Sequence, residues 1–176
     1  MSDPPGSVRF VGDLLTFSIG PRRGLRRGTR ATDWYEQGCA LEARDPEAAM
    51  AAYRRALAGR PDLADAHNNL GRLHHDRREL ADAESCYRLA ICVDAQIPLY
   101  WFNLGVALED QGRCAEAIAA YERALELGPA SADAHFNLAR LLELGGRRAD
   151  DEVLLRRAVR HLARYRDLTR ISGGAR

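Results

Sequence analysis

Apolar and polar residues follow one another in residues 31–168 at the three- and four-residue steps of amphipathic helices. In one stretch, Leu104 and Leu108 share a face of one predicted helix, and Ala117 and Tyr121 share a face of the next. Gly112 interrupts the pattern between the two helices. The chain is therefore predicted to form helix pairs that are joined by short turns.

The same pattern returns at an interval of 34 residues. Leu70, Leu104 and Leu138 each precede a small residue at this interval, and the Ala-Tyr-Ala set of residues 83–90 recurs at 117–124. One helix pair cannot bury its apolar face alone, so this period predicts a stack of neighbouring pairs.

The third copy carries the clearest motif. The residues of this motif are Trp101, Leu104, Gly105, Leu108, Gly112, Ala117, Tyr121, Ala124 and Pro129. This spacing resembles the tetratricopeptide repeat, and the resemblance covers residues 31–168. It implies an all-α fold, a right-handed α-solenoid of antiparallel helix pairs, with repeats at 31–63, 64–97, 98–131 and 132–168.

The first and fourth copies depart from the pattern. Asp45-Pro46-Glu47 predicts a tight turn in the first copy, with Asp45 as the N-cap and Pro46 in the first helical turn. In the fourth copy, Gly145-Gly146 predicts the turn, and residues 147–170 are expected to form one long capping helix. Its side chains expected to cover the end of the stack are Leu154, Ala158, Leu162 and Tyr165.

The ends of the chain differ from the repeat domain, which is expected at 31–170. Residues 1–30 form a basic N-terminal arm, in which "VRFVGDLLTFSI" is a candidate short β-hairpin and "GPRRGLRRGTR" a flexible linker. Residues 171–176 are expected to form a flexible tail.

Charge is distributed unevenly along the 176 residues. Residues 1–30 carry six Arg and two Asp, a net of +4, and residues 147–176 carry nine Arg and four acids, a net of +5. The segment between them carries eleven Arg and nineteen acids, a net of −8. Basic ends are attracted to nucleic acid, but aromatic interleaving, a helix-turn-helix and a zinc pattern are all missing from the sequence.

Residue usage narrows the class of protein further. All 26 basic residues are Arg, a bias typical of GC-rich bacterial codons. The four Cys form no C-x-x-C pair, so reduced thiols are expected. The sequence has neither an apolar run of membrane-spanning length nor the pattern of a secretory signal, so a cytoplasmic location without membrane contact is expected.

Sequence motifs for catalysis are also missing. The chain has no H-E-x-x-H, no G-x-S-x-G, no Gly-rich phosphate loop and no paired catalytic carboxylates. The "HHD" of residues 74–76 points in several directions on a helix, and His74 occupies a core position of the repeat. We therefore expect a protein that is not an enzyme and has neither a metal nor a cofactor.

The resemblance implies a groove lined by the first helix of each repeat, where peptides bind. The predicted peptide-binding residues are Asn69, Asn103, Asn137, Phe102, Phe136, Arg72 and Arg140. An amide donates and accepts hydrogen bonds, so a row of Asn can hold an extended backbone. The row is similar to the asparagine ladder of O-linked N-acetylglucosamine transferases. The alternative is that each Asn bonds a neighbouring helix.

Another binding mode of the family, the carboxylate clamp for chaperone C-termini, is mostly missing. Asn69 matches one Asn of the clamp. However, Tyr35, Cys39, Leu99 and Asn103 stand where the clamp uses Lys, Asn, Lys and Arg. Binding of that type is not expected.

The predicted function is a non-catalytic scaffold that binds a partner protein or extended peptide in the groove. The alternatives are a nucleic-acid-associated regulatory component that uses the Arg-rich ends, and an accessory domain of a glycosyl-transfer system. The sequence does not determine the oligomeric state.

Overall fold

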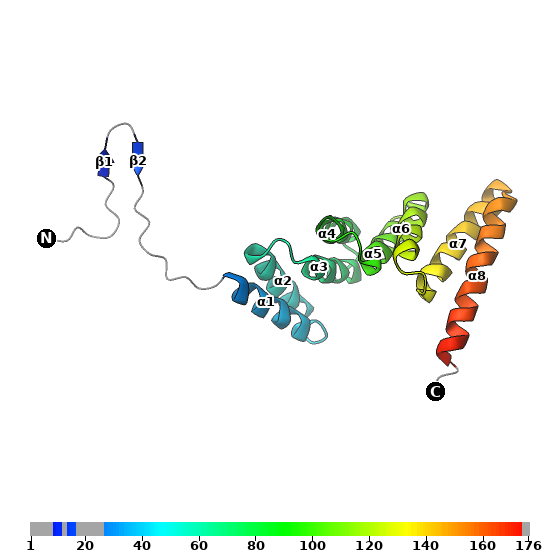
Figure 1. The fold of residues 1–176 in the computed structure, drawn as a ribbon, viewed down its shortest axis with the longest axis horizontal. Helices are drawn as coiled ribbons and strands as arrows, with labels where there is room; N and C mark the ends of the chain where they lie inside the picture. Colours follow the sequence, from blue (N-terminus) through cyan, green and yellow to red (C-terminus); the bar gives the residue numbers. More distant parts are fainter. Residues whose placement is uncertain (1–8, 12–13, 17–26, 174–176) are drawn as a thin grey trace.

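The computed structural model describes residues 9–11, 14–16 and 27–173, and side-chain exposure for residues 30–170. Figure 1 shows its helices as a row of antiparallel pairs, from α1/α2 to α7/α8. The helices are α1 (Arg27–Leu41), α2 (Pro46–Gly59), α3 (Ala64–Asp76), α4 (Leu80–Val93), α5 (Pro98–Asp110), α6 (Cys114–Leu127), α7 (Ala132–Ala149) and α8 (Glu152–Gly173). This arrangement confirms the α-solenoid.

Two short strands are described before the helices. They are β1 (Arg9–Val11) and β2 (Leu14–Thr16), which pair antiparallel with Phe10 opposite Leu15. Both lie in the sequence that was predicted to form the N-terminal arm. Residues 27–30, predicted to end the flexible linker, instead begin α1, and residues 171–173 of the predicted tail belong to α8. The rest of the arm and residues 174–176 lie outside the described residues.

Stacking of the pairs builds the core. The second helix of each of the first three pairs packs against the first helix of the next, α2 on α3, α4 on α5 and α6 on α7. The side chains with the least exposure include Tyr53, Tyr121, Leu138 and Leu142. Each pair therefore buries its apolar face against its neighbours, as the repeat period predicted.

Close contact inside the first three pairs depends on glycine. A β-carbon on Gly38 would lie 2.5 Å from the Tyr53 ring, and one on Gly105 would lie 2.6 Å from the Tyr121 ring. These separations are shorter than van der Waals contact, so only a residue without a side chain fits. The fourth pair has Ala139 at this position, and this side chain is fully buried.

The turns follow local sequence. Asp45 caps α2 by accepting a hydrogen bond from the Ala48 backbone N at 3.0 Å, with Pro46 at the helix start, which confirms the predicted N-cap and helix start. In the third pair the turn contains Gly112 at φ +77°, a left-handed conformation that glycine adopts without steric cost. The first turn, residues 42–45, is one residue longer than the turns 77–79 and 111–113, so it is not the tighter turn that the sequence predicted. It contains no positive φ, since every residue described with one lies further along the chain.

The fourth pair corrects the sequence prediction. Gly145-Gly146 is not a turn, because α7 continues through both residues to Ala149. The turn lies at Asp150, which has φ +52°, and the Asp151 side chain accepts from the Val153 backbone N at 2.8 Å to start α8. The absence of a side chain at Gly146 lets Leu155 pack against the α7 backbone, so Gly146 serves helix contact.

The capping helix α8 is only partly as predicted. It begins at Glu152 rather than at residue 147, because α7 takes up five residues more than α5. Ala158 is buried, and Leu154 and Tyr165 are half-buried. Leu162 is 38% exposed and does not cover the stack as expected.

Candidate functional site

The predicted peptide-binding residues all lie on the first helices of pairs two to four. Asn69 and Arg72 lie on α3, Asn103 on α5, and Asn137 and Arg140 on α7. The three Asn are half-buried, and the two Arg are exposed. A hollow beside Arg72 is lined by Glu42, Ala43 and Pro46 together with Leu73, Asp76 and Arg77.

Asn69 and Asn137 make the same internal hydrogen bond. The Nδ2 of Asn69 donates to the Tyr53 hydroxyl at 3.3 Å, and the Nδ2 of Asn137 donates to the Tyr121 hydroxyl at 3.4 Å. Each Tyr lies on the second helix of the preceding pair. This finding is the alternative that the sequence left open, in which Asn bonds a neighbouring helix. For Asn137 this is the one hydrogen bond with a described residue, so the amide is oriented and keeps further donor and acceptor capacity. Asn69 also donates to the Cys39 sulfur at 4.0 Å and accepts from the Nδ2 of Asn68 at 3.4 Å, so it keeps less.

The two Arg are neutralised by the preceding pair. Arg72 pairs with Glu42, and Arg140 pairs with Glu109. The same glutamates accept from the tyrosine hydroxyls, Glu42 from Tyr53 at 2.5 Å and Glu109 from Tyr121 at 3.0 Å. Two polar networks result. The first polar network is Glu42, Tyr53, Asn69 and Arg72, and the second polar network is Glu109, Tyr121, Asn137 and Arg140.

Burial sets the acidity of the tyrosines in these networks. Burial raises the pKa of Tyr121 to about 12, although the hydrogen bond from Asn137 acts in the opposite direction. Burial, with the hydrogen bonds to Cys39 and Glu42, also raises the pKa of Tyr53. Both hydroxyls therefore stay protonated near neutral pH and can donate to their glutamates.

The middle interface, between α3/α4 and α5, has no such network. Val106 stands at the position of the Arg, and His75 stands at the position of the Glu. Asn103 instead donates to the Oδ1 of Asn68 at 2.8 Å. His75 bonds Asp110 at 3.1 Å, one helix further along the groove. Asn68 in turn donates from its Nδ2 to the Oδ1 of Asn69 at 3.4 Å, so hydrogen bonds connect Asn103 to Asn69 through Asn68. Among the described residues, no such bond continues from Asn103 to Asn137.

Phe102 and Phe136 have different environments. The Phe102 ring lies 5.7 Å from the Tyr121 ring and packs against the core. The Phe136 ring lies 5.2 Å from the Tyr165 ring and is 42% exposed. Phe136 is therefore the better placed of the two to contact a ligand.

The sequence analysis missed the tyrosines as hydrogen-bonding centres of the site. A signal was present, because Tyr follows Glu after eleven or twelve residues and Asn-x-x-Arg begins sixteen residues after Tyr, twice in the chain. The repeated spacing alone does not predict that these four side chains touch. That prediction also requires the relative position of two neighbouring helix pairs.

A group of possible metal ligands lies outside the groove. His74, Glu79 and Asp82 come within 4.8 Å of one another. The Nδ1 of His74 bonds Glu79 at 2.6 Å, and Glu79 also accepts from Arg77 at 3.0 Å. The bond with His74 lowers the pKa of Glu79. These hydrogen bonds hold the turn before α4 in place and explain why the three side chains lie together. His74 is buried, as its core position predicted.

In the part of the chain that the structure describes, none of the helices has the length and apolar character needed to span a bilayer.

Three stretches of the chain match known sequence families. Residues 102–167 and 63–93 match families described as "Tetratricopeptide repeat", and residues 47–77 match one described as "TPR repeat". Together they cover both polar networks from residue 47 onward.

Curated relatives match about two fifths of the chain. The peroxisomal targeting signal receptor of Kluyveromyces lactis is 39% identical over 70 residues, which is 40% of this chain and 12% of the receptor. The receptor of Saccharomyces cerevisiae is 37% identical over 70 residues, 40% of this chain and 11% of the receptor. The match spans only about an eighth of the length of these relatives.

Solved structures share the fold. A crystal structure of MamA has a TM-score of 0.73 at 17% identity, covering 82% of this chain and 81% of MamA. The first TPR domain of Spaghetti (RPAP3), solved with the HSP90 peptide SRMEEVD, has a TM-score of 0.64 at 22% identity, covering 66% of this chain and 94% of that domain. At these identities the likeness concerns the fold.

Proposed function

Because this chain is a tetratricopeptide repeat protein, we propose that it is a non-catalytic scaffold that binds an extended segment of a partner protein along α1, α3, α5 and α7. A repeat protein of this kind acts in protein interaction, and its stacked first helices form a long surface rather than an enclosed pocket. The Spaghetti domain, which shares this fold, is bound to an HSP90 peptide, and this supports a peptide as the class of ligand.

The single observation that carries the proposal is the anchoring of the Asn row. Tyr53 holds Asn69, Asn68 holds Asn103 and Tyr121 holds Asn137, each through an Nδ2 bond. Asn69 is the most fully bonded of the three, because its Nδ2 also donates to the Cys39 sulfur at 4.0 Å and its Oδ1 accepts from Asn68. The amides are half-buried, so their remaining capacity is accessible. Groups that are already oriented lose less entropy on binding. In this proposal the amides bind the peptide backbone, and Phe136 binds an apolar side chain.

Arg72 and Arg140 take a smaller part than their exposure suggests. Each is already paired with a glutamate of the preceding pair. A ligand carboxylate would have to compete with Glu42 or Glu109 for the guanidinium. The proposed ligand is therefore held by backbone and apolar contacts more than by acidic side chains.

The test is a peptide-array screen with the full chain, followed by titration of the best peptides. The triple variant Asn69→Ala, Asn103→Ala and Asn137→Ala is expected to lose most of the binding. Gln96→Ala, which changes an exposed amide in the loop before α5, is the matched control and is expected to bind normally. Equal binding by the triple variant and the control, with both variants folded by circular dichroism, would remove the Asn row from the proposal.

The nucleic-acid alternative has weaker support. The Arg residues of α8 are interleaved with Val153, Val159 and Leu162 rather than with aromatic residues on which bases stack.

A further inference from the structure

Helix α8 is packed on one side only. Each earlier second helix packs on the first helix of its own pair and on the first helix of the next pair. Helix α8 packs on α7, and no helix within residues 27–173 lies beyond it (Figure 1). The outward side of α8 is thus the place where the solenoid geometry would receive another helix.

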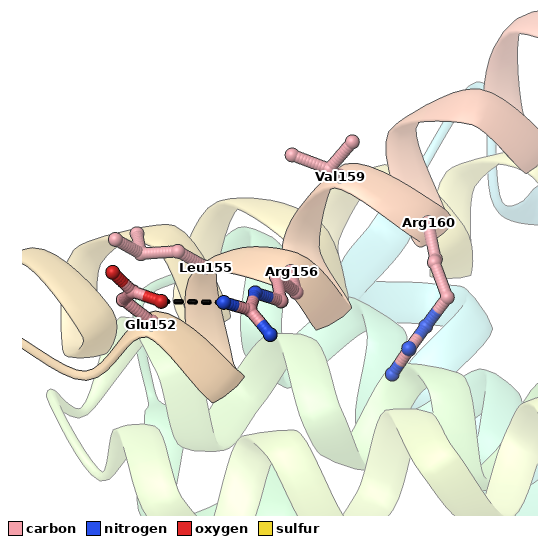
Figure 2. Close-up of a pocket in the computed structure, with 5 residues that line it drawn as sticks. All are labelled: Glu152, Leu155, Arg156, Val159 and Arg160. Carbon is pink, nitrogen blue, oxygen red and sulfur yellow. Dashed lines mark hydrogen bonds and ion pairs between the residues drawn. The ribbon is translucent and has the colours of Figure 1, made fainter.

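This outward side exposes apolar side chains. Val159 is 65% exposed and Leu162 is 38% exposed, and together with Leu155 they follow the i, i+4, i+7 spacing of one side of a helix. Val159 and Leu155 line a shallow hollow whose other lining residues are Glu152, Arg156 and Arg160. Figure 2 shows Val159 standing away from the helix, with the ion pair between Glu152 and Arg156 at one end of the hollow. The helix therefore offers an apolar strip with charged margins.

The margins are basic. Residues 152–170 contain six Arg and two acids. Arg156 is paired with Glu152, and Arg157 with Glu122. Arg160 and Arg164 are exposed and form no ion pair with any described residue. Their charges are available to an acidic partner.

We propose that the outward side of α8 binds an acidic amphipathic helix of a partner protein, which lies along α8 as α7 lies along α6. The apolar strip supplies area to bury, and the free Arg select negative flanks. A second α8 would bring the same excess of Arg and be repelled. A membrane surface is less suited, because one Val and two Leu offer little insertion and the strip lacks aromatic residues.

The experiment selects binders from a displayed library of amphipathic helices with randomised flanking positions, using the full chain as bait. Enrichment of Glu and Asp at the flanks is expected. Val159→Asp is expected to weaken the selected helices about tenfold or more, because it places a charge in the strip. The double variant Arg160→Glu and Arg164→Glu is expected to enrich Lys and Arg instead. Leu89→Asp changes an exposed Leu of α4 and serves as the control with unchanged binding.

Several outcomes would overturn the proposal. One is a selection without acidic enrichment, and another is equal binding by the Val159→Asp variant. Binding to vesicles of phosphatidylserine and phosphatidylcholine that Val159→Asp removes would assign the strip to a membrane. A dimer in sedimentation that Val159→Asp dissociates would assign it to a second copy. The triple Asn variant is expected to bind the selected helices normally, so failure of the groove proposal and failure of this one are distinguishable.

Discussion

Gly105 of α5 lies so close to Tyr121 of α6 that a β-carbon on Gly105 would stand 2.6 Å from the ring. Tyr121 has no exposed surface and cannot move aside into solvent. The same ring lies beside Phe102, and its hydroxyl belongs to the second polar network. One close contact between two residues therefore holds together a helix pair and the network that orients Asn137.

The first prediction follows from this contact. Gly105→Ala is expected to lower the free energy of unfolding by about 1–2 kcal/mol, because overpacking costs about 1–3 kcal/mol and better helix propensity returns up to about 1 kcal/mol. Urea denaturation measures the change. The control is Gly145→Ala, whose β-carbon would meet Leu154 at an ordinary 3.7 Å. That variant is expected to be neutral or more stable, and equal losses in the two variants would contradict the steric explanation.

The second prediction concerns the tyrosine hydroxyls. Tyr121→Phe removes a group that accepts from Asn137 and donates to Glu109, so a loss of about 1–2 kcal/mol of stability is expected. Tyr87→Phe is the matched control. The Tyr87 hydroxyl makes no hydrogen bond with a residue of the described chain, and this variant is expected to stay within about 0.5 kcal/mol of the parent. Thermal unfolding followed by circular dichroism compares the two, and a larger loss in Tyr87→Phe would refute the assignment.

The third prediction concerns pH. The Nδ1 atoms of His135 and His161 lie 2.9 Å apart, and His135 Nε2 lies 3.2 Å from the Pro129 carbonyl oxygen. Burial lowers the pKa of His161, and His135 and Arg157 lower it further. Arg160 acts in the same direction, whereas Glu122 opposes it.

Because the folded pKa of His161 lies below the unfolded value of about 6.5, the unfolded state takes up a proton first as the pH falls. The contribution of neutral His161 to stability is thus present above about pH 6.5 and is lost as the pH falls through the folded pKa of His161. Unfolding free energies measured from pH 7.5 down to pH 5 are expected to decline, by roughly 1.4 kcal/mol for each unit between the two pKa values. His161→Gln is expected to flatten that decline, and an unchanged slope in the variant would refute the role of His161.

The fourth prediction separates the two phenylalanines. Phe136→Ala is expected to weaken peptide binding while changing stability little, since the ring is 42% exposed. Phe102→Ala is expected to destabilise the fold by about 2 kcal/mol or more, because its ring packs against the core beside Tyr121. Calorimetric titration with an array-selected peptide and urea denaturation give the two quantities. The opposite pattern would show that Phe102, and not Phe136, faces the ligand.

A fifth prediction applies to the exposed ion pairs. Arg140→Ala is expected to reduce peptide binding less than Asn137→Ala does, because Glu109 already neutralises Arg140. Its effect on stability is expected to be about 0–1 kcal/mol, as for other partly exposed pairs. Titration of the two single variants with the same peptide compares them. A larger binding loss in Arg140→Ala would show that the ligand displaces Glu109.

The repeat period was readable because it depends on local spacing. The Leu-Gly and Ala-Tyr-Ala positions recur at intervals of 34 residues. Each set lies on one face of its helix, and this does not depend on how the neighbouring helices pack. The turn at Asp45-Pro46 was readable for the same reason, since an N-cap and a helix-starting proline act within four residues.

The turn of the fourth pair could not be predicted from local spacing. Gly145-Gly146 gives a turn signal in sequence, but glycine also permits close helix contact. Leu155 packs at Gly146, so tertiary contact decided between the two meanings. The outward position of Leu162 follows from helical geometry, because eight residues after Leu154 the helix has turned about 80° beyond two full turns.

The sequence by itself determined the helix pairs, their stacking and the positions of the Asn and Arg residues along the groove. Only the tertiary structure decided what those residues bond, namely Tyr53 and Tyr121 for two of the Asn, and Glu42 and Glu109 for the Arg. The physical reason is range. Helical periodicity is set within a few residues of chain, whereas a hydrogen bond between neighbouring pairs depends on the offset between two helices, which the whole packed stack fixes.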